Sequence, residues 1–114
     1  MDERHLLELI RKALTVDRSA TTFEQLSVAG SVVSLPSIPT DATYAIVTLE
    51  STDTSSIVVR TTEGKSTPSV TVGLPKTNLD SWDILGAENI KNTQLIATTL
   101  GQSATNVLNV QYYR

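Results

Sequence analysis

The chain has no cysteine, a single histidine and few aromatic residues: one tryptophan, one phenylalanine and three tyrosines in 114 residues. Without cysteine, no disulfide holds the fold and no thiol chemistry is available. The lone His5 cannot form a histidine metal cluster, and a Ser-His-Asp triad would have to draw it from the N-terminal segment. Catalytic, cofactor and metal sites are therefore not expected.

Long hydrophobic runs and excess positive charge are also missing. No window approaches the roughly 18 apolar residues that a membrane span requires, so no membrane partner is expected. The first apolar run, at 6–10, is interrupted by Glu8 and followed by Arg11 and Lys12, unlike a signal peptide. The net charge of −3 argues against a nucleic-acid partner, because such proteins carry a basic stripe.

Serine and threonine are abundant: they total 29, against 21 charged residues. Threonine fits the pleated surface of a sheet, so this composition favours a β-rich surface over a helical one. The length corresponds to one domain.

Residues 2–14 predict a short amphipathic helix, with acidic residues in its first turn and basic residues near its end. A helix of this length is marginal alone, so it needs a packing partner: its own domain, copies of itself or a groove on another protein. Residues 15–22 read as a linker. We therefore divide the chain into a docking or oligomerisation segment, 1–20, and a β-domain, 21–114. The apolar helix face that we expect to dock comprises Leu6, Leu7, Ile10 and Leu14.

Beyond the linker, alternation of apolar and polar residues predicts a series of strands. Strand spacing of roughly 8 to 12 residues indicates an all-β, antiparallel sandwich or jelly-roll-like domain. The clearest strands, 42–50 and 106–114, are expected deep in a sheet, the latter with Leu108, Val110 and Tyr112 inward. The other predicted strands are 23–28, 31–35, 57–61, 70–73, 79–85 and 93–99, with turns at 63–65 and from Asn89.

The order of short phrases along 29–114 resembles a family of small structural proteins of tailed bacteriophages. The best-matching phrase is Asn-Val-Gln-Tyr-Tyr-Arg at 109–114, and the family's usual Asp-Gly turn is Glu-Gly at 63–64. Thr61 stands where the family has an aromatic residue. The remaining phrases are Gly-Ser-Val at 30–32, Leu-Pro-Ser-Ile-Pro at 35–39, Ala-Thr-Tyr-Ala-Ile-Val at 42–47, Glu50, Val-Arg at 59–60, Pro68, Gly73, Asn-Ile at 89–90 and Ile-Ala at 96–97.

The resemblance implies a small β-sandwich carried on the virion as a capsid accessory, head fibre or tail component. Such modules commonly associate with themselves, so the expected partners are copies of the chain, with a trimer as the first expectation, and other virion structural proteins. The alternative is a carbohydrate- or receptor-binding β-module on the virion surface, which the small supply of aromatic residues disfavours. No nucleophile and base pair supports a hydrolase.

Individual residues admit a structural and a functional interpretation. Trp82 lies beside Ile84 in the predicted alternation, which makes it a core or interface anchor, and Tyr113 is expected to be an exposed contact residue. Arg60 is expected to pair with Glu50 across a hairpin. The acidic residues Asp80, Asp83 and Glu88 lack the spacing of a calcium loop and are interpreted as solvated carboxylates.

Overall fold

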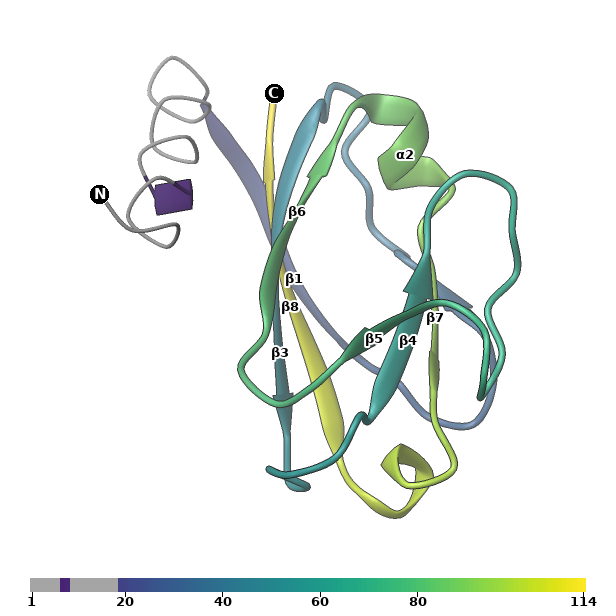
Figure 1. The fold of residues 1–114 in the computed structure, drawn as a ribbon. Helices are drawn as coiled ribbons and strands as arrows, with labels where there is room; N and C mark the ends of the chain where they lie inside the picture. Colours follow the sequence, from purple (N-terminus) through teal and green to yellow (C-terminus); the bar gives the residue numbers. More distant parts are fainter. Residues whose placement is uncertain (1–6, 9–18) are drawn as a thin grey trace.

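The chain folds into two antiparallel four-stranded sheets that face each other (Figure 1). The computed structural model describes residues 7–8 and 19–114. The expected β-rich fold with two antiparallel sheets is confirmed. Residues 7 and 8 are helical, and the rest of the predicted N-terminal helix lies outside the described residues.

Within residues 19–114, the chain forms two sheets and two short helical segments, joined by turns and loops. Sheet A has the order β1-β8-β3-β6 and sheet B the order β2-β7-β4-β5. Sheet A comprises β1 (Ala20–Ser27), β8 (Asn106–Tyr113), β3 (Tyr44–Ser51) and β6 (Ser81–Leu85). Sheet B comprises β2 (Val33–Ser34), β7 (Gln94–Ala97), β4 (Val59–Thr62) and β5 (Leu74–Lys76), and the helical segments are α2 (Ala87–Lys91) and the 3-10 turn η1 (Gly101–Ser103).

The last strand, β8, is central in sheet A, as its alternation predicts. It pairs with β1 on one side and with β3 on the other. Leu108, Val110 and Tyr112 are fully buried, while the residues between them face outward and are half-buried. Strand β3 is also central, between β8 and β6, and this position explains why it carries apolar residues on both faces.

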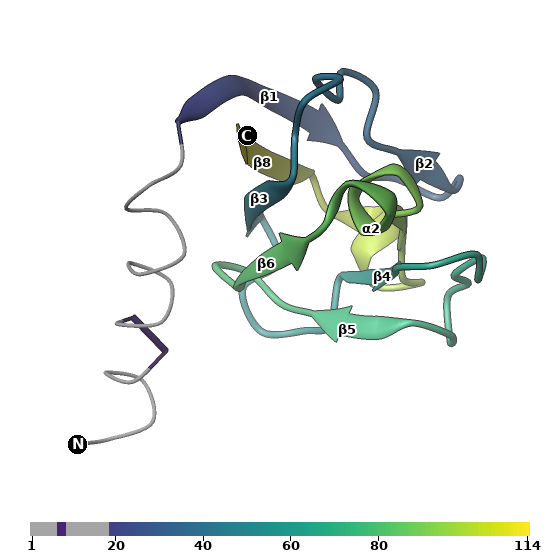
Figure 2. The same ribbon diagram turned by 90° about the horizontal axis from the view of Figure 1, so that it is seen from above.

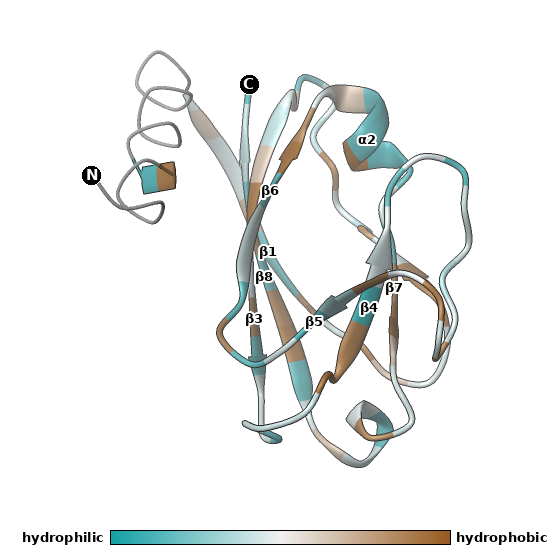
Figure 3. Ribbon diagram, in the orientation of Figure 1, coloured by the Kyte–Doolittle hydropathy of each residue, from teal (hydrophilic) through white to brown (hydrophobic). Residues whose placement is uncertain are grey.

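The hydrophobic core fills the space between the sheets. Strand β3 contributes Ala45, Val47 and Leu49, and strand β7 contributes Leu95 and Ala97. Figure 3 shows hydrophobic residues along β4, β7 and β8, which also contribute to this interior. Seen from above, α2 lies over one end of the interior (Figure 2), where its Ile90 is fully buried. Burying one aliphatic side chain contributes about 1.5–3 kcal/mol.

One polar side chain, Asn106, is buried at the opposite end of the sandwich and joins three segments. Its Nδ2 donates to the carbonyl oxygens of Val28 at 3.1 Å and Gly101 at 2.8 Å, and its Oδ1 accepts from Ser51 Oγ at 2.7 Å. Gly101 is required there because an added Cβ would lie 1.9 Å from the carbonyl oxygen of Val58. Hydrogen bonding of this kind allows a polar group to be buried without penalty.

Four local predictions differ from the structure. Residues 20–22, predicted as the end of the linker, form the start of β1. The strand predicted at 70–73 is instead a set of bends, and the strand β5 follows at Leu74–Lys76 with Pro75 inside it. Proline is tolerated because β5 is an edge strand, where a missing N–H breaks no second ladder. Asn89, expected to open a turn, lies within α2. The strand predicted at 31–35 shortens to the two residues of β2.

Candidate interaction sites

The residues predicted to mediate contacts do not form one surface in the described structure. Leu6, Ile10 and Leu14 lie outside the described residues, as does His5. Leu7 is helical and 60% exposed. Trp82 and Tyr113 both belong to sheet A but face opposite ways, Trp82 inward opposite Val47 and Tyr113 outward opposite Tyr44.

Trp82 is partly buried and packs against the hydrophobic core. The ammonium group of Lys76, on the neighbouring edge strand β5, lies 4.4 Å from the centre of the Trp82 ring. Burial lowers the pKa of Lys76, and the nearby carboxylates of Asp80 and Glu63 oppose this shift. The cation–π contact between Trp82 and the ammonium group of Lys76 therefore links the two sheets at this edge.

Tyr113 belongs to an aromatic end of the outer face of sheet A. Its ring centre lies 5.5 Å from that of Tyr44, which is fully buried although it faces outward from the sheet. Phe23 on β1 and Leu85 on β6 share this face and are 55% and 49% exposed. The other end of the same face is polar, with Asn109 hydrogen-bonded to its neighbours on β1 and β3.

The acidic residues singled out in the sequence do not converge. The carboxylate of Asp80 accepts a hydrogen bond from the backbone N–H of Thr77 at 2.7 Å and fixes the turn before β6. Glu88 forms a 3.8 Å ion pair with Lys91 on the exposed side of α2. Within residues 7–8 and 19–114, no group of three His, Cys, Asp or Glu side chains is arranged to hold a metal ion. In the same part of the chain, no helix is long and apolar enough to cross a bilayer.

The predicted ion pair between Arg60 and Glu50 is wrong. Glu50 lies in sheet A and accepts a hydrogen bond from Asn109 at 2.8 Å, whereas Arg60 lies in sheet B. The segment between β3 and β4 crosses from one sheet to the other instead of forming a hairpin, which separates the two side chains. Arg60 donates instead to the carbonyl oxygens of Val70 at 3.2 Å and Gly73 at 2.9 Å.

These two bonds hold a tight turn against the outer face of sheet B. Within the turn, Ser69 and Val72 exchange backbone hydrogen bonds of 2.9 and 3.3 Å. The hydroxyl of Ser69 also accepts from the N–H groups of Thr71 and Val72. The turn is thus fixed by its own bonds and by the guanidinium group of Arg60.

An apolar patch surrounds Arg60 on this side of the molecule. We use this name for Ile57, Val70 and Leu100, which are 40%, 37% and 61% exposed and line a shallow hollow of about 230 Å³ with Arg60. Val72, at the end of the turn, is 55% exposed. Large exposed apolar side chains that share one hollow are typical of contact surfaces.

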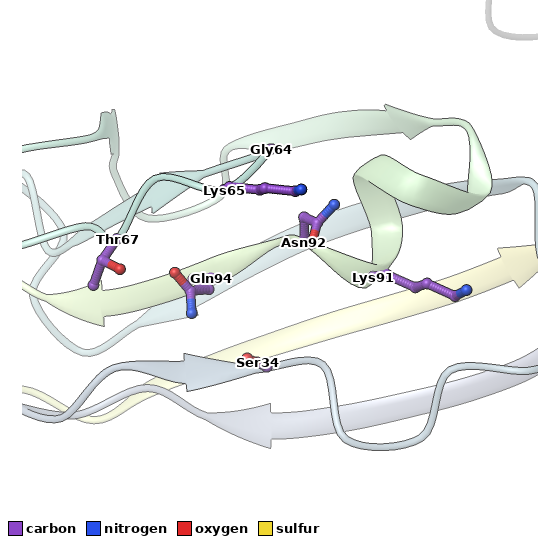
Figure 4. A pocket seen from close by; sticks show the side chains of 7 residues that line it. All are labelled: Ser34, Gly64, Lys65, Thr67, Lys91, Asn92 and Gln94. Atoms are coloured by element: carbon purple, nitrogen blue, oxygen red, sulfur yellow. The ribbon is translucent and has the colours of Figure 1, made fainter.

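A second hollow, of about 200 Å³, is polar and lies where β2, the 63–67 turn, the end of α2 and the start of β7 meet (Figure 4). The side chain of Lys65 extends towards Asn92, and the amide of Gln94 points towards Ser34. Lys91 extends away from the others, towards solvent. We call this feature the polar hollow; its lining residues are Ser34, Gly64, Lys65, Thr67, Lys91, Asn92 and Gln94.

All polar side chains of the hollow except that of Lys91 are uncommitted. Lys91 pairs with Glu88, whereas Ser34, Lys65, Thr67, Asn92 and Gln94 make no side-chain hydrogen bond or ion pair with any residue of the described chain. Among residues 7–8 and 19–114, no carboxylate lines the hollow. Five polar groups that face a common space without internal partners are free to bind a ligand.

Sequence reasoning found neither the apolar patch nor the polar hollow. It identified the turn at 63–65, and Gly64 indeed has the positive φ of 73° that such a turn requires. No spacing in the sequence relates this turn to Ser34 or Asn92, because the hollow gathers residues from segments far apart in the chain. The unusual backbone of Leu79, with a φ of 69°, also gave no signal.

No protein-family model matches the sequence, and comparisons with curated proteins and with solved structures find no significant match.

Proposed function

We propose that the chain is a non-enzymatic structural component of a tailed-phage virion that acts through protein–protein interfaces. The proposal combines the phage resemblance of residues 29–114 with the apolar patch around Arg60, which is the observation that carries it. The partner expected on the patch is a second copy of the chain, and the assembled state expected first is a trimer.

The patch suits an interface because its frame is rigid before any partner binds. The hydrogen bonds from Arg60 and within the 69–72 turn fix the backbone that presents Val70. A surface that is already ordered loses little conformational entropy on association, so more of its apolar burial contributes to affinity. Ile57 and Leu100 complete this contact area, which is formed by three separate segments of the chain, 57–60, 70 and 98–100.

The N-terminal segment is the second part of the proposal. We infer that residues 2–14 form the amphipathic helix that the sequence predicts and that its apolar face docks on symmetry-related copies or on another virion protein. The exposure of Leu7 supports this role, because an apolar helix face that is open to solvent is available to a partner.

Light scattering on the full chain tests the patch. We expect Leu100→Ser combined with Val70→Ser to weaken self-association by about tenfold or more, as the loss of two central apolar contacts does. Leu79→Ser is the matched control, since Leu79 is 70% exposed but borders a different hollow, next to Glu50 and Thr105. A wild-type chain that is monomeric at high concentration would refute the proposed self-assembly.

A chain that starts at Ser19 tests the N-terminal segment. It retains all of β1 and the hydrogen bond from the N–H of Arg114 to the carbonyl oxygen of Ser19 at 3.1 Å. We expect it to stay folded by circular dichroism and to form smaller assemblies than the full chain. If both chains form assemblies with the same number of copies, residues 1–18 have no oligomerising role.

The virion assignment has a direct test. Mass spectrometry of purified particles from a phage that encodes this sequence should find the chain in a fixed ratio to the major capsid protein. Its absence from particles, with the chain present in infected cells, would contradict the assignment.

A second candidate function is binding of a carbohydrate or receptor on the virion surface. The observation that favours it is the polar hollow with its uncommitted side chains.

A further inference from the structure

We propose that the polar hollow binds a sugar acid, with its carboxylate at Lys65 and its hydroxyl groups at Asn92, Gln94, Ser34 and Thr67. This inference names a ligand class for the second candidate function and does not depend on self-assembly. Three observations support it: the chemical groups that line the hollow, the absence of partners for five of these side chains within the described chain, and the directions in which Lys65 and Lys91 extend.

The lining separates into two kinds of hydrogen-bonding group. Lysine ammonium groups only donate, which suits an oxyanion. Amide and hydroxyl side chains such as those of Asn92, Gln94 and Ser34 both donate and accept, which suits sugar hydroxyls because these also do both. A molecule with one carboxylate and several hydroxyls matches both kinds at once.

The surroundings also favour an acidic ligand. None of the described residues that line the hollow carries a carboxylate, so a bound anion meets no direct repulsion from them. The same lining residues include no aromatic ring, which disfavours neutral sugars that are bound by stacking, but a sugar acid is held by its charge. The volume of about 200 Å³ accommodates one small ring rather than an extended chain.

Lys65 and Lys91 differ in a way that makes the proposal specific. Lys65 extends across the hollow towards Asn92, whereas Lys91 extends away and lies 3.8 Å from the carboxylate of Glu88. A ligand that sits in the hollow must depend more on Lys65 than on Lys91. A ligand that is merely attracted to positive charge must depend on both equally.

The test is an NMR titration of the full chain with D-glucuronate, with glucose and acetate as matched probes that carry only the ring or only the carboxylate. We expect glucuronate to shift the backbone amide signals of Gly64, Lys65 and Asn92 with a dissociation constant of about 1–10 mM, typical of a small, solvent-accessible polar ligand. Glucose and acetate should bind at least about fivefold more weakly, since each lacks one of the two kinds of contact.

Variants locate the site. Lys65→Gln should weaken glucuronate binding by about fivefold or more, whereas Lys91→Gln should change it by less than about twofold. Arg114→Gln removes a positive charge from the end of β8 in the other sheet and should have no effect. Equal losses for Lys65→Gln and Lys91→Gln, acetate binding as tight as glucuronate, or no saturable shift with glucuronate would each overturn the proposal.

Discussion

Replacing Asn106 by aspartate should remove the link that joins three segments at one end of the sandwich. The change preserves the shape of the side chain but turns its donating amide into a carboxylate oxygen. In the native chain, this amide donates to the carbonyl oxygens of Val28 and Gly101, and the side chain is only 2% exposed. Asn106→Asp therefore leaves the carbonyl of Val28 without a donor, leaves that of Gly101 with only the N–H of Ala104, and places a negative charge beside both.

The expected loss can be worked out from these contacts. The Val28 carbonyl that loses its partner costs about 1–3 kcal/mol and the lost bond to Gly101 costs about 0.5–1.5 kcal/mol, so the two changes together cost about 2–4 kcal/mol before the burial of charge is counted. This is a large share of the roughly 5–15 kcal/mol that stabilises a typical domain. With an m-value of about 1–3 kcal/mol per molar urea, the unfolding midpoint should fall by about 1–2 M or more.

The matched control is Asn78→Asp. Asn78 uses only its Oδ1, which accepts from the backbone N–H of Ser51 at 2.8 Å, and a carboxylate accepts that bond equally well. We expect the stability of this variant to stay within about 0.5 kcal/mol of the native chain. The assay is urea unfolding followed by Trp82 fluorescence at pH 7.

A pH series makes the prediction sharper. The buried carboxyl that Asn106→Asp introduces should have a folded-state pKa above its unfolded value of about 3.9, because its neighbours are acceptors. The destabilisation should therefore grow as pH rises above about 4 and shrink at pH 3, where the carboxyl is protonated in both states. Equal stabilities for Asn106→Asp and Asn78→Asp at pH 7 would refute the reasoning.

Three further predictions concern single positions. Gly101→Ala should cost at least about 3 kcal/mol in thermal or urea unfolding, because its Cβ would meet the backbone of Val58 at 1.9 Å, and a change under 1 kcal/mol would contradict the close approach. Leu79→Gly should raise the free energy of unfolding by about 1 kcal/mol, since the φ of 69° is strained for leucine. A lower unfolding temperature of this variant in calorimetry would argue against strain. Burial raises the pKa of Tyr112, and the charge of the nearby Glu24 carboxylate raises it further. The unfolded state therefore loses its proton first, and native stability should fall by about 1.4 kcal/mol per pH unit above about pH 10 from this group. Tyr112→Phe should remove that fall and be neutral or stabilising at pH 7; a steeper alkaline loss in the variant would refute the assignment.

Strands that are buried on one face were predictable because burial imprints a period of two on their residues. This holds for β8, where every second residue from Leu108 is inside, and for β3, where the additional apolar residues mark a central strand. Leu26 and Val28 were also correctly placed towards the core.

Short or irregular elements carried too little pattern to be predicted. The helix α2 buries only Ile90, so no helical period is visible in its five residues. Strand β5 contains Pro75, and proline normally argues against a strand; only its position at the edge of sheet B makes it acceptable.

The candidate sites depended even more on the path of the chain. Arg60 and Glu50 are close in sequence, and a hairpin between them was a reasonable expectation. The chain instead crosses to the other sheet, and Arg60 binds the 69–73 turn. The polar hollow likewise brings Ser34, Lys65 and Asn92 together only because β2 and β4 both flank β7.

By itself, the sequence determined the β-class of the domain, the inward and outward faces of its long strands and the absence of cysteine chemistry. These properties are local, because they follow from the identity and period of neighbouring residues. Tertiary structure alone decided which strands pair, which partner Arg60 binds and where apolar and polar side chains gather on the surface. Those outcomes depend on contacts between distant segments, whose energies are realised only when the two sheets have closed over a common core.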